Sequence, residues 1–417
     1  MKIAVIGAGI IGVTTAYELG RDGHEVTVFE RRGAAAEETS FANAGIVAPG
    51  YVTPWAAPGM PRKVLGQLLQ RHASVKIGFP LSMQELAWMW RWFRACRLDQ
   101  YLLNRTRLQR LAFYSRSRLH AVRDHLRLEY DRSDGYLVLL RTEHDRELVQ
   151  PGLQVLRDAG VTFRQLDPGK ARMVEPALSA DTAFVGAILV PDDEVGNCRQ
   201  FALLLKNEAQ RLGVKFSFNT PVTHLRASRG ITVAITGPTP AQEFDAAVVC
   251  AGLHSAALLR PLGPRIPLAA VYGYSLSAAI REPLNAPRSA VMDEHYKVAI
   301  ARLGQRIRIA GSAELGGRLE RKRAGSLQTL YKVLHDWFPG AANRASGIQE
   351  WKGARPMLPD GPPIVGASGV AGLWLNLGHG SSGWALACGS ARALADQILG
   401  HEPELDMQGF ALSRLNP

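Results

Sequence analysis

The sequence predicts an α/β (α+β) protein in which a Rossmann-type domain with a parallel sheet is joined to a second domain with a mixed or antiparallel sheet. The chain has 417 residues, more than one hydrophobic core usually accommodates, so two packed domains are expected. Its first thirty residues have the pattern of a strand, a helix and a second strand. Its middle alternates apolar and polar residues, for example over residues 306–310, as in a sheet with one solvated face.

The N-terminal unit is defined by a change of periodicity. Residues 2–6 form a short apolar run that ends in glycine, which indicates a parallel strand buried on both faces. The spacing of apolar residues becomes helical over residues 10–21, and residues 25–30 predict the second strand. Together these elements form a βαβ unit of about 30 residues.

The remaining elements follow a long irregular segment, residues 31–80, which is rich in Gly, Pro and Ala. Loops of that length in a compact domain are usually functional. Helices are expected at residues 84–128, 154–160, 199–213, 324–338 and 382–399. Strands are expected at residues 135–141, 161–166, 214–219, 231–236, 246–250, 271–276, 291–303, 306–310, 364–366 and 373–377.

Both ends of the chain have α/β character, whereas the middle is antiparallel in character. This order predicts a nucleotide-binding domain assembled from separate segments, with a substrate domain inserted between them. The expected nucleotide-binding segments are residues 1–80, 195–255 and 350–417, and the expected substrate-binding segments are residues 81–194 and 256–349.

Composition narrows the class of protein. The chain is 47% hydrophobic and 21% charged, as in soluble globular proteins. Its four cysteines are scattered without a Cys-x-x-Cys pair, so we expect buried or free thiols and no metal site. No apolar stretch of about 18 residues lacks charge, which predicts no membrane-spanning helix. The expected location is the cytoplasm or the inner face of the cytoplasmic membrane.

The net charge of +12 suits nucleic acid, anionic lipid or acidic substrates, but it also suits an ordinary solvated surface. The sequence carries no arginine-rich tail, zinc-finger spacing or RNA-binding motif. A nucleic-acid partner is therefore not expected.

The first turn after the N-terminal strand carries the strongest motif. Residues 7–12 read Gly-Ala-Gly-Ile-Ile-Gly, a G-x-G-x-x-G between a strand and a helix. The glycines permit a tight turn, close approach of a pyrophosphate and close helix–strand packing. Glu30, at the end of the second strand, is placed to accept from ribose hydroxyls, which disfavours a 2′-phosphate and hence NADP.

Two further segments distinguish the cofactor. The motif alone leaves NAD and FAD open, but a long loop after the terminal Rossmann unit favours FAD, since an extended flavin needs a second stretch of chain along it. Residues 38–45 are small and polar, and they form either this stretch or an ordinary turn. Residues 378–383 form a glycine-rich turn before a long helix, whose free amides would stabilise a reduced, anionic flavin.

A substrate anchor is predicted in the Gly/Pro-framed segment 351–361. Arg355 offers a planar fork that matches a carboxylate, whereas Lys352 is a competing cation with poorer geometry. The phenol of either Tyr272 or Tyr274 could donate a hydrogen bond to the same carboxylate. His379 is either a proton carrier or a hydrogen-bonded residue beside the turn. Tyr296 and Lys297 are second-rank candidates.

Ordered motifs along the whole chain resemble the small-subunit type of bacterial D-amino acid dehydrogenase, within the wider family of D-amino acid oxidase and glycine oxidase. The motifs are GAGIIG, ETSFANAG, PGY, PWAAPG, WMW, GYLVLLRT, GYSL, MDE followed by YK, RPMLPDG, PIVGA, GHG and ACGS.

The resemblance implies FAD-dependent oxidative deamination, with hydride transfer from Cα to flavin N5 and electrons passed to a quinone or respiratory chain. It places the carboxylate-binding arginine on Arg355 and its helper on Tyr274; Tyr272, Tyr296, His295 and His379 complete the candidate set. The implied cofactor-binding residues are Gly7, Gly9, Ile10, Ile11, Gly12, Glu30, Arg31, Ser40, Asn43, Ala44, Gly45, Val222, Ala251, Gly252, Arg355, Gly378, His379, Gly380, Ser381, Ser382 and Gly383.

The chain departs from the family pattern at three places. His295 stands where the family often has Thr, Ser381-Ser382 where it tends to have Thr-Leu, and Lys352 within WKGA where WTGL is usual. These departures leave the substrate open, and the alternative is a cyclic or secondary amino acid such as D-proline, hydroxy-D-proline, glycine or sarcosine. The run Trp88–Phe93 mixes aromatic residues with arginine, as in a membrane or quinone contact or in a helix packed on the core.

Overall fold

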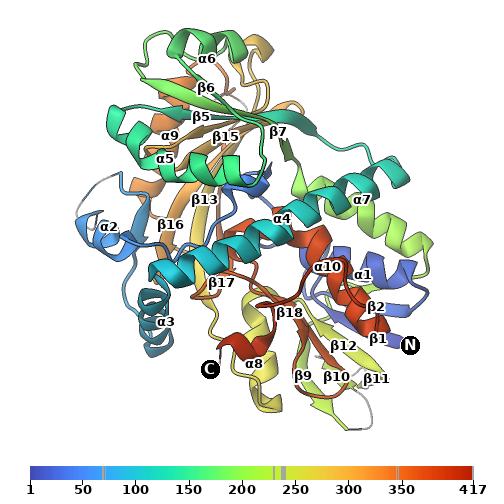
Figure 1. Cartoon of the computed structure of the whole chain (residues 1–417). Helices are drawn as coiled ribbons and strands as arrows, with labels where there is room; N and C mark the ends of the chain where they lie inside the picture. Colours follow the sequence, from blue (N-terminus) through green and yellow to red (C-terminus); the bar gives the residue numbers. More distant parts are fainter. Residues whose placement is uncertain are drawn as a thin grey trace.

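The computed structural model describes residues 1–67, 70, 72–228, 231–235, 241–343, 345 and 347–415. Two large sheets dominate it, one in the lower right and one in the upper left of Figure 1, and the long helix α4 runs across both. A separate three-stranded sheet, β11-β10-β9, lies beside the lower body.

The elements have the following bounds. The helices are α1 (Ile10–Arg21), α2 (Met60–Gln67), α3 (Met83–Ala95), α4 (Leu98–Leu126), α5 (Glu143–Asp158), α6 (Pro168–Val174), α7 (Cys198–Arg211), α8 (Ser255–Leu259), α9 (Ala324–Trp337) and α10 (Gly383–Leu399). The strands are β1 (Lys2–Ile6), β2 (Glu25–Phe29), β3 (Ile46–Val47), β4 (Val75–Ile77), β5 (Arg132–Leu140), β6 (Arg164–Leu166), β7 (Gly186–Gly196), β8 (Lys215–Ser217), β9 (Val222–Ala227), β10 (Ile231–Ile235), β11 (Gln242–Phe244), β12 (Ala246–Val249), β13 (Ala269–Ala279), β14 (Ala290–Asp293), β15 (Val298–Leu303), β16 (Arg306–Leu315), β17 (Gln349–Met357), β18 (Ile364–Ala367) and β19 (Leu373–Leu377).

The lower body is a six-stranded sheet in the order β18-β19-β12-β1-β2-β8. All neighbours in it are parallel except β18 and β19. Because parallel strands end at the same edge, the residues that follow β1, β2, β12 and β19 meet there, at the usual place for a ligand. These residues include Gly7, Glu30, Ala251 and Gly378.

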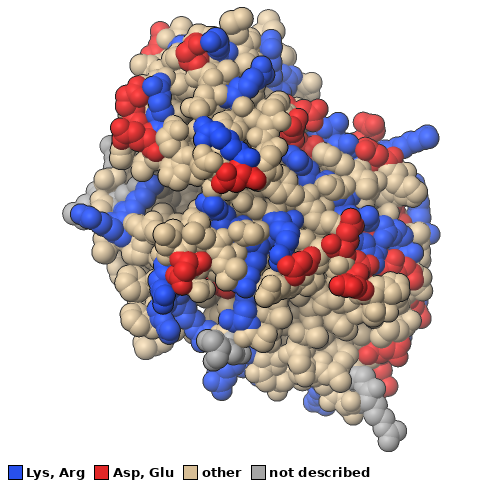
Figure 2. All heavy atoms as spheres, viewed as in Figure 1, with Lys and Arg blue, Asp and Glu red and all other residues tan. Residues whose placement is uncertain are grey.

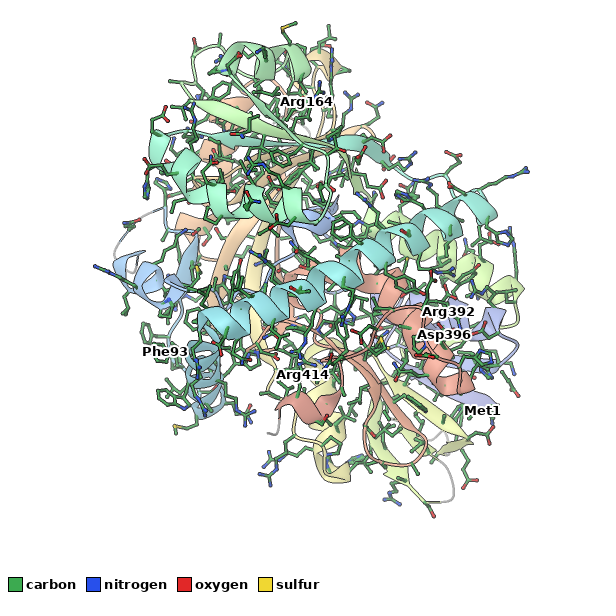
Figure 3. The ribbon with its side chains drawn as sticks, viewed as in Figure 1. Met1, Phe93, Arg164, Arg392, Asp396 and Arg414 are labelled. Atoms are coloured by element: carbon green, nitrogen blue, oxygen red, sulfur yellow. The ribbon has the colours of Figure 1, made fainter. Side chains whose placement is uncertain are left out.

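Helices α1 and α10 pack against each other on this sheet, and α4 and α7 pack on them in turn (Figure 1). A buried ionic network joins the first two. Arg392 of α10 contacts Glu18 of α1 at 2.8 Å and Asp22 at 2.6 Å, and it also pairs with Asp396 on its own helix (labelled with Arg392 in Figure 3). Since both helices begin at the ligand edge, this network fixes the two helix N-termini relative to each other.

The upper body is a ten-stranded mixed sheet whose main path is β17-β13-β16-β15-β14-β5-β7-β3. Alternate residues of each strand face opposite sides. One face, including Tyr274, Val298 and Ile309, packs with α9, and the other face carries Tyr136, Val138 and Ala301. The second of these faces is turned toward the six-stranded sheet's ligand edge, as the lining of the shared cavity shows.

The structure corrects several predicted elements. The helix expected at residues 84–128 is two helices, because Arg97 has extended backbone angles and begins a new helix. The strand expected at 291–303 is the β14–β15 hairpin, whose turn places Lys297 at φ +54°. The irregular segment 31–80 contains β3, α2 and β4, and β7 was missed entirely. Thr236, in an expected strand, lies outside the described residues.

Every strand of the six-stranded sheet lies within residues 1–80, 195–255 or 350–417. However, β3, β4 and nearly all of β17 also fall in those ranges, and they pair into the ten-stranded sheet. The four cysteines are free thiols, three of them buried. No helix among the described residues is long and apolar enough to cross a membrane. On the face shown in Figure 2, Lys and Arg side chains are interspersed with Asp and Glu.

Candidate active site

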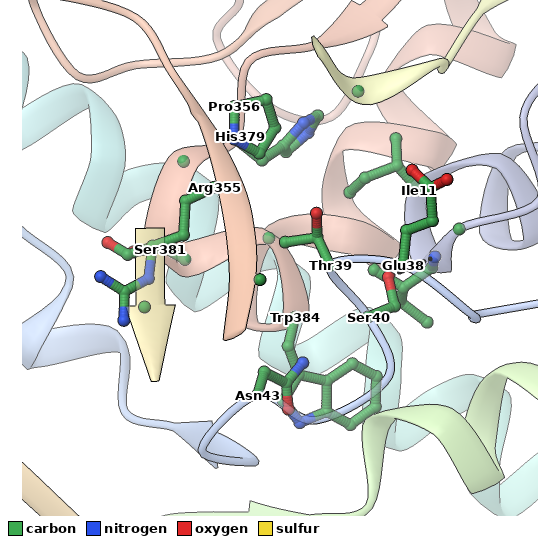
Figure 4. A pocket seen from close by; sticks show the side chains of 18 of the residues that line it. Ile11, Glu38, Thr39, Ser40, Asn43, Arg355, Pro356, His379, Ser381 and Trp384 are labelled. Atoms are coloured by element: carbon green, nitrogen blue, oxygen red, sulfur yellow. Dashed lines mark hydrogen bonds between the residues drawn. The ribbon is translucent and has the colours of Figure 1, made fainter. Parts of the chain in front are cut away.

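A cavity of about 590 Å³ lies between the two sheets (Figure 4). Its walls come from the ligand edge of the six-stranded sheet, the segment 37–46, the turn 376–385 and one face of the ten-stranded sheet. All but one of the residues expected to bind the cofactor line it; the exception, Gly12, lies behind the first turn, against the backbone of Gly7. Segments more than 300 residues apart in sequence therefore meet at one site.

The first end of the cavity is built from the glycine-rich turn. Gly7 has φ +105°, and a Cβ there would lie 2.7 Å from the carbonyl oxygen of Cys250. A Cβ at Gly12 would overlap the carbonyl oxygen of Gly7. Helix α1 can therefore pack this closely against the turn only because position 12 is glycine. The N-cap residue of α1, Gly9, has no side chain to cap the helix, and the first turn has no acidic residue; among the described residues the amide of Ile10 alone is bonded to a side chain, that of Ser40. The N-terminus of α1 therefore offers amides and a positive dipole end to an anion.

Glu30 is fixed at this end by two backbone donors. Its Oε2 accepts from the amide of Ala8 at 2.7 Å, and its Oε1 from the amide of Arg32 at 2.8 Å. Arg31 is bonded to Glu38 and to His254, so its side chain belongs to the rim of the cavity. Val222, Ala251 and Gly252 line the same region, where the sequence-based list placed them.

The segment from Ser40 to Gly45 runs along the middle of the cavity and is held from several sides. Ser40 Oγ accepts from the amide of Ile10 at 3.0 Å. Arg308 of β16 donates to the carbonyl of Asn43 at 3.3 Å, and Trp384 Nε1 donates to the carbonyl of Gly45 at 3.1 Å. The segment is thus attached to α1, to the ten-stranded sheet and to α10.

The second end of the cavity is the turn before α10. Gly378 and Gly380 have positive φ, and Cβ atoms there would approach Leu358 at 2.5 Å and Met357 at 2.7 Å. The turn continues as a short 3-10 helix (Gly380–Ser382) into α10, which has no capping side chain. A second set of open amides therefore faces the cavity, opposite the N-terminus of α1.

His379 lies within this turn but is buried, with 4% of its surface exposed. Its Nε2 lies 3.0 Å from Ser390 Oγ, and burial lowers the pKa of its imidazole to about 3. The side chain is therefore neutral at physiological pH. This geometry favours the hydrogen-bonded alternative for His379 over the proton carrier.

Arg355 reaches into the cavity from β17 (Figure 4). Its guanidinium passes over Gly273, where a side chain would overlap it, and Nη1 donates to the carbonyl of Ser312 at 3.1 Å. Among the described residues no carboxylate pairs with it, and burial lowers its pKa to about 10. A buried cation without a counter-charge is costly unless an anion binds beside it.

Lys352, the competing cation, faces the other side of the sheet. It pairs with Glu314 at 3.0 Å and donates to the carbonyls of Arg318 and Arg321. Alternation along β17 explains the difference, since Lys352 and Arg355 are three residues apart. Of the two cations, the structure brings Arg355 to the cavity.

Tyr274 contributes to the lining of the cavity, but the hydroxyls of both tyrosine candidates are directed away from Arg355. The hydroxyl of Tyr274 donates to Glu314 and accepts from the amide of Arg323 at 3.2 Å, on the face of the sheet that packs with α9. Lys352 lies over the rings of both Tyr272 and Tyr274, which places Tyr272 on that side too. The expectation that either phenol donates to a carboxylate at Arg355 is not supported by these contacts.

His295 and Tyr296 do not line the cavity. His295 Nδ1 lies 3.1 Å from Asp145, and the Tyr296 ring packs against the cations of Arg141 and Lys332. Both residues belong to the β14–β15 turn. Their side chains therefore do not have the directions that a continuous strand over residues 291–303 would give them. Their neighbour Lys297 does line the cavity.

Sequence reasoning missed several lining residues. They are contributed by elements that pair only in the folded chain: Tyr51, Tyr136, Met292, Glu294, Ala299 and Ala310. Tyr51 and Tyr136 pack edge to face at 5.3 Å although 85 positions separate them. No local pattern distinguishes these residues from ordinary core positions, except that Tyr51 follows the Pro-Gly of the long loop.

The residues present fit a long cofactor with two polar ends. A pyrophosphate would be held by the amides of the first turn and of α1, a ribose by Glu30, and an aromatic ring system by Ser40–Gly45 and the turn before α10. No group of three or more His, Cys, Asp or Glu suited to a metal ion occurs in the part of the chain that the structure describes.

Comparisons with known proteins agree with this arrangement. The model of a family described as FAD dependent oxidoreductase matches residues 2–397. The chain is 43% identical over 416 residues to a D-amino acid dehydrogenase of Rhodopseudomonas palustris (strain HaA2), covering 99% of this chain and 98% of the relative. It is 42% identical to a D-amino acid dehydrogenase of Allorhizobium ampelinum, with the same coverage.

Solved structures share the fold at lower identity. Glycine oxidase from Geobacillus kaustophilus has a TM-score of 0.78 at 22% identity, covering 99% of this chain and 98% of that one. L-proline dehydrogenase from P. horikoshii has a TM-score of 0.74 at 16% identity, covering 100% and 97%. These likenesses show that the chain shares its fold with both proteins.

Proposed function

Because the chain belongs to the FAD-dependent oxidoreductase family, we propose that it is a D-amino acid dehydrogenase. The reaction converts a D-amino acid, water and an oxidised acceptor into a 2-oxo acid, ammonia and the reduced acceptor. The observation that carries the proposal is Arg355, a half-buried cation without a carboxylate partner in the wall of the cavity. The 43% identity to a protein with this activity supports it further.

When bound, FAD supplies the two-electron acceptor for the Cα–H bond of the substrate. The protein's part is to bind and orient. Arg355 presents its free donors to the substrate carboxylate, while its bond to Ser312 prevents the guanidinium from rotating. The buried wall around it excludes water from the carboxylate, which strengthens the attraction.

Neither candidate proton acceptor of the described site is free, and the lining carboxylate Glu294 pairs with Lys297. His379 is neutral but bonded to Ser390, and Tyr274 is bonded to Glu314. This is consistent with binding of the substrate as a neutral amine, which needs no base before Cα–H cleavage. Arg355 then stabilises the only full charge on the substrate.

The direct test is anaerobic reduction of the bound flavin by a panel of D-, L- and N-methyl amino acids. We expect bleaching of the visible flavin absorbance by D-amino acids and none by their L-enantiomers. Bleaching by L-amino acids alone, or by no amine at all, would refute the proposal. The alternative, oxidation of glycine, sarcosine or a cyclic amino acid such as hydroxy-D-proline, predicts that those compounds reduce the flavin faster than any primary D-amino acid.

We further propose that the electrons pass to a membrane quinone and that α3 contacts the bilayer. This helix has two apolar faces. Trp88 and Trp92 are buried, and Trp88 donates to the carbonyl of Met357 beside the cavity. Met83, Leu86, Trp90 and Phe93 are exposed at three- and four-residue spacing, so they form one outer stripe, with Phe93 at the margin of the molecule in Figure 3.

The surroundings of this stripe favour an anionic bilayer as its occupant. Trp90 and Phe93 stack at 6.0 Å, and the neighbouring Arg91, Arg94 and Arg97 are exposed. Aromatic residues next to arginines suit the interface of a membrane with anionic lipids.

Sedimentation with vesicles tests this contact. Wild-type protein should bind vesicles that contain phosphatidylglycerol, and the double variant Trp90→Ser/Phe93→Ser should bind several-fold less. Leu284→Ser is the matched control, because Leu284 is 84% exposed but lies in another part of the molecule. Equal binding by all three proteins, or no binding by the wild type, would contradict a membrane role for α3. A high yield of peroxide in air would contradict the proposal that a quinone is the electron acceptor.

A further inference from the structure

The register of the ten-stranded sheet places three lining residues in one row. Ala310 of β16 pairs with Ala299 of β15, and Ala299 pairs with Met292 of β14. Directly paired residues have their side chains on the same face of a sheet. All three line the cavity, so they form a continuous floor across three strands.

The floor begins beside the substrate anchor. Arg355 is bonded to the carbonyl of Ser312, which is on the same strand as Ala310 and two positions further along. A carboxylate held by Arg355 therefore sits over β16, and the rest of the ligand can extend over β15 toward β14. Two alanines on this path leave space that larger side chains would fill.

The length of the floor exceeds what a small substrate needs. From β16 to β14 is two strand spacings, roughly 10 Å. A methyl side chain would occupy only the first part of that distance, whereas an aromatic ring or a long aliphatic chain would use most of it. Burial of that apolar surface would contribute to binding in proportion to its area.

The walls of this channel are aromatic or electrically balanced. Tyr51 and Tyr136 pack edge to face beside the floor. On the side of the β14–β15 turn, Glu294 and Lys297 pair with each other, which leaves that wall without net charge. Neither wall offers an unpaired charge to a substrate side chain, so apolar side chains suit it better than ionised ones.

We propose that Ala310, Ala299 and Met292 select the side chain of the substrate and admit extended apolar or aromatic D-amino acids. This inference rests on the proposed function, because it takes the carboxylate anchor at Arg355 as its starting point. It assigns the discrimination to side-chain volume at Ala299 and Met292. These two residues lie farther from Arg355 than Ala310 does, since they are on the next strands of the row.

Substitutions at Ala299 and Met292 should move specificity in opposite directions. Ala299→Val narrows the channel, and we expect kcat/KM for D-phenylalanine to fall roughly tenfold or more, with D-alanine changed less than about threefold. Met292→Ala lengthens the channel. It should raise the kcat/KM for D-tryptophan relative to the kcat/KM for D-alanine. Ala278→Val is the matched control, since Ala278 is equally buried but lies on the opposite face of the sheet, under α9.

A binding measurement separates this inference from the proposed function. Phenylpyruvate and pyruvate are non-reducing ligands whose binding can be followed through the flavin spectrum, with flavin content as a check on folding. Ala299→Val should raise the Kd of phenylpyruvate and leave that of pyruvate unchanged. If the substitution raises the Kd of both ligands equally, or raises neither Kd, the channel assignment is overturned. If no D-amino acid bleaches the wild-type flavin, the proposed function fails, but these two Kd values still decide the channel.

Discussion

Replacement of Arg355 by methionine should separate substrate binding from folding. The guanidinium has one protein acceptor, the carbonyl of Ser312, so its remaining donors are available to a substrate carboxylate. Hydrogen bonds to a charged group contribute about 1.5–3 kcal/mol each. Two such bonds give about 3–6 kcal/mol, and because a tenfold change corresponds to about 1.4 kcal/mol, kcat/KM should fall by about 10²–10⁴-fold.

The same substitution should leave the fold intact. Burial lowers the pKa of Arg355 to about 10 without a carboxylate to offset the desolvation of the charge, so an apolar side chain of similar length removes a cost as well as a hydrogen bond. We expect an unchanged or higher Tm and full flavin content. Stopped-flow flavin reduction and thermal unfolding measure the two effects separately.

Lys352→Met is the informative comparison. Lys352 lies in the same strand but is paired with Glu314, and its removal leaves this buried carboxylate with only Arg323, at 3.5 Å, and the hydroxyl of Tyr274 as partners, which destabilises the fold. It should therefore lower Tm while the KM of the remaining folded enzyme changes little. A fall in kcat/KM of less than threefold for Arg355→Met, or a loss of flavin with it, would refute the carboxylate assignment.

Three further predictions concern the cofactor end of the site. Gly9→Ala should reduce FAD affinity without lowering the Tm of the apoprotein, because the nearest protein atom to its Cβ would be 3.5 Å away; Gly12→Ala should destabilise the apoprotein itself, because its Cβ would overlap backbone. His379 has a folded pKa of about 3, below its unfolded value, so its stabilising effect is present above about pH 6.5 and is lost as pH falls toward 3; His379→Asn should flatten the loss of Tm between pH 7 and pH 5. Arg392→Met should lower the urea unfolding midpoint and weaken FAD binding, since Asp22 and Asp396 lose a cation while Glu18 keeps Arg21 and Arg118; an unchanged unfolding midpoint would contradict the role of the network.

The N-terminal unit shows where local sequence is sufficient. The predicted helix at residues 10–21 and the strands at 2–6 and 25–30 match α1, β1 and β2 to within one residue. Glycines at 7 and 12 are required by backbone contacts that are part of the motif itself, so their function can be inferred without the rest of the chain. The second glycine-rich turn is of the same kind, because it too lies between a short strand and a long helix.

Elsewhere the pattern was ambiguous for physical reasons. The sequence around Arg355 predicts only a Gly/Pro-framed segment, yet Arg355 lies in β17, because β13 pairs with that strand along nine residues. A proline is tolerated there since β17 is at the end of the sheet path. The sequence left two alternatives for the run Trp88–Phe93, a helix packed on the core or a contact with a membrane or quinone. In the structure Trp88 and Trp92 are buried, whereas Trp90 and Phe93 are exposed.

The sequence by itself determined a dinucleotide-binding turn and a second glycine-rich helix start, because each depends on residue types at a fixed local spacing. The assignment to FAD and the role of Arg355 came from the resemblance to a known family, because spacing alone left NAD and FAD, and Arg355 and Lys352, as alternatives. Only the tertiary structure decided which neighbours share the cavity. Strand register turns Tyr272, Tyr274 and Lys352 to the far face and assembles Ala310, Ala299 and Met292 into one floor. Register is set by pairing between strands that are distant in the chain, and a shift of one residue would reverse every side chain, so no local pattern can reveal it.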